Sequence, residues 1–99
     1  MITSIHSVTG QETRIPSQIA EEVEFLSSTF SLLRDSEEIY NDEFLEAGSI
    51  QGGLNLLSAM ISNGAEAEEL EIQISSLKDR ALSICERFPN LDKKIESRR

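Results

Sequence analysis

The chain has 99 residues, and its eighteen acidic and nine basic side chains give a formal net charge of −9. A chain of this length forms one domain with a modest core. Because nucleic acids and anionic membrane surfaces are bound by clustered lysine and arginine, this charge argues against both kinds of partner.

Residues 1–16 show no sustained hydrophobic period. Ile2, Ile5 and Val8 do recur every three residues, but the serines, threonines and glycine around them favour a helix poorly. The sequence therefore predicts a flexible N-terminal arm. Its composition would also suit an uncleaved export leader.

Residues 17–47 are predicted to form the first long helix, with Ser17 as its cap and Gly48 as its end. Nine acidic residues and one basic residue give this segment a net charge of −8. The acidic stretch 35–38 is the weakest part, so the pattern fits either one helix or two. Its apolar residues follow the four-three spacing of one helical face: Ile19, Val23, Leu26, Phe30, Leu33, Tyr40 and Phe44.

Residues 50–62 are predicted to form a second, largely buried helix, because they carry no charge and have apolar side chains on much of the circumference. Gly52 and Gly53 disfavour a helix, so it is expected to start after them. Asn63 and Gly64 predict the turn that follows.

Residues 64–88 contain the most regular pattern, and we predict that this third helix carries the partner-binding stripe. Asn63 and Glu66 resemble a capping box at its start, and Pro89 ends it. The spacing of four and three is that of a helix packed lengthwise against another. The stripe comprises Leu70, Ile74, Leu77, Ala81, Ile84 and Phe88.

Residues 89–99 form a basic C-terminal tail with a net charge of +2. Leu91 and Ile95 are four residues apart, so a last short helix is possible.

Chemical motifs are missing from the helical segments. The one histidine, His6, lies in the predicted arm, and the one cysteine, Cys85, has no histidine near it in sequence to activate it. We therefore predict no enzyme, no metal and no cofactor. The acidic side chains instead suggest a solvated face or a possible docking face for a partner: Glu21, Glu22, Asp35, Glu37, Glu38, Asp42 and Glu43.

Taken together, the sequence predicts an all-α fold, either a small antiparallel bundle of three main helices or a helical hairpin with coiled-coil-like packing. The leading functional hypothesis is a small acidic adaptor or chaperone that binds a protein partner through amphipathic helices. The alternatives are a self-assembling structural or exported subunit, for example of a bacterial secretion apparatus, and an acidic inhibitor that mimics nucleic acid. With no apolar run of bilayer length and no signal peptide, we expect a cytoplasmic protein, or one exported without a cleaved signal.

Overall fold

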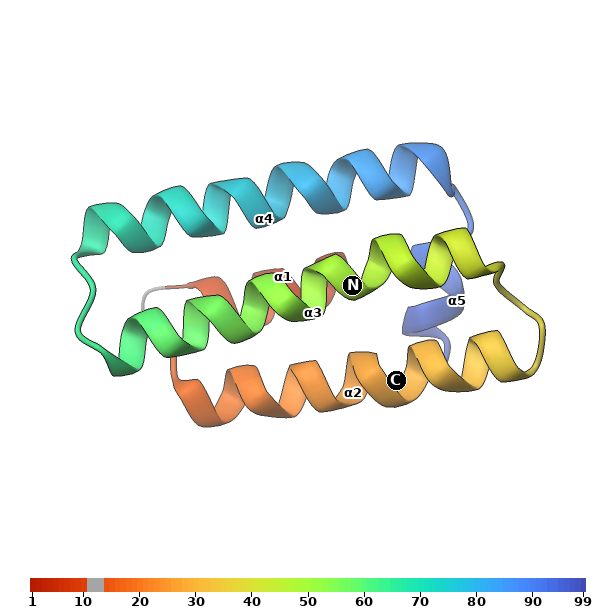
Figure 1. Ribbon diagram of the computed structural model, residues 1–99, viewed down its shortest axis with the longest axis horizontal. Helices are drawn as coiled ribbons and strands as arrows, with labels where there is room; N and C mark the ends of the chain where they lie inside the picture. Colours follow the sequence, from red (N-terminus) through yellow and green to blue (C-terminus); the bar gives the residue numbers. More distant parts are fainter. Residues whose placement is uncertain (11–13) are drawn as a thin grey trace.

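The computed structural model describes residues 1–10 and 14–99, and within them every regular element is a helix (Figure 1). The elements are α1 (Ile2–Thr9), α2 (Pro16–Asp35), α3 (Asn41–Ser62), α4 (Ala67–Arg87) and α5 (Leu91–Glu96). The molecule measures 40 × 24 × 18 Å along its principal axes. The prediction of an all-α fold is confirmed.

Three long helices form the frame of the bundle. Consecutive helices run antiparallel, with α3 packed against both α2 and α4 (Figure 1). The short helices α1 and α5 lie behind α3 in Figure 1; α1 packs against α4 and α2, and α5 packs against α2. The two short helices therefore share the fourth position of the bundle.

The core is formed by apolar side chains from all five helices, which recur at helical spacing along each one. Phe30 is the largest of the fully buried side chains. The fully or almost fully buried set includes Ile5, Ile19, Leu26, Leu33, Ile50, Leu54, Leu57, Ile74, Leu77, Ile84, Leu91 and Ile95. Burial of these side chains is the main favourable contribution to folding.

The two turns between the long helices have the same backbone geometry. After α2, Glu37 is left-handed (φ 62°), and Glu38 N–H donates to the Leu33 carbonyl at 2.9 Å. After α3, Gly64 is left-handed (φ 75°), and the Ala65 N–H reaches back to Met60 in the same way, also at 2.9 Å. These bonds satisfy carbonyls at the helix end.

The single helix over 17–47 is wrong, and the two-helix alternative is the correct one. The break falls at the acidic stretch that the sequence marked as weak: α2 ends at Asp35, and α3 begins at Asn41. Pro16, rather than Ser17, is the first residue of α2, where its missing N–H costs nothing.

The predicted end at Gly48 is also wrong, and so is the predicted start of a second helix at residue 50 or after Gly53, because α3 continues through all three of its glycines. At Gly53 the reason is close packing between helices. A β-carbon there would overlap the Leu77 Cδ2 of α4 and lie 3.2 Å from Leu77 Cγ. Packing against α4 thus favours glycine at this position despite its low helix propensity.

The prediction of a flexible arm over residues 1–16 also differs from the structure, which has a helix in this segment. Residues 2–9 form α1, and Met1, Ile5 and Val8 are buried in the core. Tertiary contacts here override a weak local propensity. The part of the predicted arm at residues 11–13 lies outside the described residues.

The last two helices follow the predicted pattern more closely. Helix α4 begins at Ala67 after Glu66 instead of directly after Asn63, and it ends at Arg87, two residues before Pro89. The short helix that the sequence allows within the basic tail, residues 89–99, is present as α5.

Candidate protein-binding site

The apolar stripe of α4, predicted to bind a partner, faces the chain's own core. Ile74, Leu77, Ala81 and Ile84 are buried, and Leu70 and Phe88 at its two ends are partly buried against the core. The heptad-like spacing thus reflects packing of α4 against helices of its own chain.

The predicted acidic docking residues differ in exposure and in their partners within the chain. Glu21, Asp35, Glu37, Glu38 and Asp42 are exposed, Glu22 is half-buried, and Glu43 is buried. Glu38 pairs with Arg98 and Asp35 with Arg34. Glu43 accepts a 3.0 Å hydrogen bond from the Tyr40 N–H and so caps α3. Several of these carboxylates therefore have structural partners within the chain.

The N-terminal ammonium lies against α5. Met1 N is 2.6 Å from Glu96 Oε1 and 2.9 Å from Asp92 Oδ1. The Ile2 N–H also donates to Asp92 Oδ1 at 3.1 Å. Because both carboxylates are partly shielded from water, these charge-assisted bonds are stronger than those of exposed pairs.

Arg99 extends this network to α2. Its guanidinium lies 2.8 Å from Glu22 Oε2, donates to Ser4 Oγ at 3.0 Å, and stacks 4.3 Å from the Phe25 ring centre. Burial alone would raise the pKa of Glu22, but the hydrogen bond from Arg99 and its charge hold that pKa below its usual value. We call the contacts of Met1, Glu22, Asp92, Glu96 and Arg99 the terminal clasp. It ties α1, α2 and α5 together.

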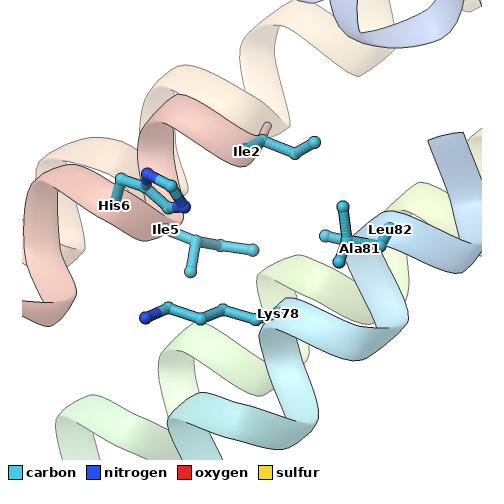
Figure 2. Close-up of a pocket in the computed structure, with 6 residues that line it drawn as sticks. All are labelled: Ile2, Ile5, His6, Lys78, Ala81 and Leu82. Carbon is cyan, nitrogen blue, oxygen red and sulfur yellow. The ribbon is translucent and has the colours of Figure 1, made fainter.

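An apolar groove of about 110 Å³ lies between α1 and α4 (Figure 2). Ile2 and Ile5 line it from α1, and Ala81 and Leu82 line it from α4. Leu82 is 55% exposed at the rim, although it is a large apolar side chain. His6 and Lys78 complete the lining, and both are exposed. The seam between the two helices is therefore incompletely filled and open to solvent.

A second apolar surface lies on the outside of α3. Leu45 and Leu56 are 62% and 52% exposed and differ by eleven residues, or about three helical turns, so they lie on one face. Gly48 and Gly52 fall between them on that face, and a β-carbon at either glycine would meet no atom within 4 Å. We call these four residues the α3 face.

Chemically reactive groups are sparse in the described part of the chain. Cys85 is half-buried, and burial, with a smaller effect from Asp92, raises the pKa of its thiol, which lowers its reactivity. Among residues 1–10 and 14–99, no three histidine, cysteine or carboxylate side chains are placed to hold a metal ion. None of the helices in these ranges is both long and apolar enough to cross a membrane.

Comparison with known proteins gives no relative: no protein-family model, no curated protein and no solved structure matches the chain.

Proposed function

We propose that this protein is a small acidic protein–protein interaction module, an adaptor or chaperone that binds a helical segment of its partner. The observation that supports this most is the groove between α1 and α4, where Leu82 remains largely exposed beside Ile2 and Ile5. Large apolar side chains gathered at a groove between helices are typical of surfaces that accept an amphipathic helix. The net charge of −9 favours a basic partner by long-range attraction.

The test is capture of a partner from native extract by the full-length chain and two variants, followed by mass spectrometry. Leu82→Asp places a charge in the groove, whereas Ser83→Asp places the same charge at an exposed neighbouring position of α4. We expect a specific partner that Leu82→Asp loses and Ser83→Asp retains. Both variants should keep the helical circular dichroism of the parent chain. Equal capture by both variants, or no specific partner, would contradict the proposal.

The α3 face supports a second candidate function, a self-assembling structural subunit. Residues 48–63 carry no charge, so two copies of this acidic chain would repel each other least along this part of α3. Gly48 and Gly52 would allow close approach of a second helix between Leu45 and Leu56.

Light scattering during size-exclusion chromatography separates the two functions. An interaction module stays a defined small species as concentration rises, whereas a subunit forms large assemblies. In the second case, Leu56→Asp should prevent assembly, and Asn55→Asp, at an exposed neighbouring position, should not. The nucleic-acid mimic has less support, because arginine side chains pair with Glu22, Glu38 and Glu46.

A further inference from the structure

We propose that α1 is a detachable cover, and that the channel it occupies between α2 and α4 receives a helix of the partner protein. That helix would repeat the pattern of α1: a positive charge at its start, followed by apolar side chains four and seven residues later. The inference rests on the proposed function and deepens it: the partner's helix would take the place of α1, which forms one wall of the groove.

Helix α1 has little intrinsic helical stability, so its place in the bundle depends on its buried side chains and on the terminal clasp. It has eight residues, and a helix shorter than about 12 residues is marginal on its own. Serine and β-branched residues make up most of its sequence, ITSIHSVT, and lower its helix propensity further. The groove of about 110 Å³ along its contact with α4 shows that the two surfaces do not fill the seam between them. Unfilled space of this kind forfeits dispersion contacts.

Detachment of α1 would uncover a channel suited to another helix. Helix α1 packs against α4 and α2, and its N-terminal end also bonds to α5. The buried side chains of Met1, Ile5 and Val8 occupy the places that a ligand helix would fill. These three follow the i, i+4, i+7 spacing by which an amphipathic helix inserts its anchors into a groove. The channel therefore already contains a segment with the geometry of the proposed ligand.

The charge at one end of the channel specifies the ligand further. Asp92 and Glu96 both bind the Met1 ammonium, and their side chains are only 31% and 24% exposed. If α1 left, both partly shielded carboxylates would lose the ammonium, and only the ion pair of Glu96 with Arg99 would remain, which is unfavourable. A ligand helix with a lysine, an arginine or a free amino terminus at that position would replace it.

The test uses a peptide of residues 1–10 that carries a fluorophore at its carboxyl end and a free amino terminus. In the full-length chain, Ile5→Asp should release α1 because it buries a carboxylate without a partner. Thr3→Asp, at an exposed position of α1, is the matched control. In the parent chain the attached α1 competes at an effective concentration of about millimolar. We expect fluorescence anisotropy to show the peptide binding at least tenfold more tightly to Ile5→Asp than to the parent or Thr3→Asp.

An acetylated form of the same peptide tests the charge requirement. Acetylation removes the cation that Asp92 and Glu96 bind, so we expect affinity for Ile5→Asp to fall at least tenfold. Equal affinity of the peptide for Ile5→Asp and the parent chain would overturn the detachable cover. Equal affinity of the two peptides would overturn the requirement for a positive charge.

Hydrogen exchange of the unmodified parent chain keeps the proposal testable if Ile5→Asp does not fold. A detachable α1 should exchange its amide hydrogens at least tenfold faster than the centre of α4. Equal protection of α1 and α4 would make α1 a fixed part of the core and overturn the proposal. A dimer formed by exchange of α1 between copies, seen by light scattering, would assign the channel to a second copy and also overturn it. These results do not depend on capturing a partner, so they are distinct from failure of the proposed function.

Discussion

At the scale of single residues, the two turns between the long helices place different residue types in the same left-handed backbone conformation. Glycine occupies this conformation after α3, but after α2 it is occupied by Glu37, whose side chain makes it unfavourable. We predict that Glu37→Gly raises the free energy of unfolding by about 0.5–1 kcal/mol, after the greater freedom of glycine in the unfolded chain is included. Urea denaturation measures the change. Gly64→Ala should lower the same free energy, and a loss of stability in Glu37→Gly would contradict this account.

Adjacent glycines in α3 give a second prediction at this scale. At Gly52 an added methyl group meets open space, so Gly52→Ala should raise the free energy of unfolding by about 0.5–1 kcal/mol. At Gly53 the methyl group would overlap the fully buried Leu77, whose displacement costs about 1–3 kcal/mol and outweighs the gain in helix propensity. The midpoints of thermal or urea unfolding of the two variants should therefore shift in opposite directions from that of the parent chain. Similar shifts would show that Leu77 moves aside freely.

At the scale of helices, regular apolar spacing predicted the buried face of α4 well. The pattern of α4 placed its buried residues correctly, because the 3.6-residue period repeats over more than five turns. The same pattern did not predict the helical state of α1, since eight residues of low propensity become helical through contacts distant in sequence, such as that of Met1 with Glu96. Gly53 was misread for a similar reason: its neighbour Leu77 is 24 residues away.

The candidate site was harder to predict than the fold. An apolar stripe has the same sequence pattern whether it binds a partner or its own chain, so the stripe containing Leu77 gave no means of choosing between them. The groove beside Leu82 depends on the position of α1, a segment for which the sequence pattern predicts a flexible arm. Pairing of Glu22 with Arg99 joins residues 77 positions apart and has no local signature.

The terminal clasp gives a prediction at the scale of helices about acid stability. Although burial raises the pKa values of Glu22 and Glu96, hydrogen bonds from Arg99 lower both below their ordinary values. A carboxyl whose pKa is lowered on folding stabilises the protein above its unfolded pKa, about 4.5, and this stabilisation is lost as the pH falls through the folded pKa. Urea unfolding between about pH 7 and pH 3 should therefore show a smaller loss of stability on acidification in Arg99→Gln than in the parent. Identical acid profiles would mean that the clasp contributes nothing.

At the scale of the whole molecule, the central question is whether the stripe of α4 holds the entire bundle together. Leu77 is fully buried at the middle of that stripe and packs against α3 at Gly53, whereas Ser76 is exposed on the same helix. Leu77→Asp would bury an unpaired carboxylate at a cost of several kcal/mol, which is comparable with the whole stability of a small domain, about 5–15 kcal/mol. Ser76→Asp leaves its carboxylate in water.

We therefore expect Leu77→Asp to unfold the isolated protein. The variant should lose helical circular dichroism at 25 °C, or its thermal unfolding midpoint should lie far below that of the parent. Ser76→Asp should change the free energy of unfolding by no more than about 0.5 kcal/mol relative to the parent. The loss should appear in α2, α3 and α4 together, because α3 packs against both α2 and α4, and a bundle of this size unfolds cooperatively. A folded Leu77→Asp chain that had lost only a binding partner would contradict the structure, because it would place Leu77 on an accessible surface.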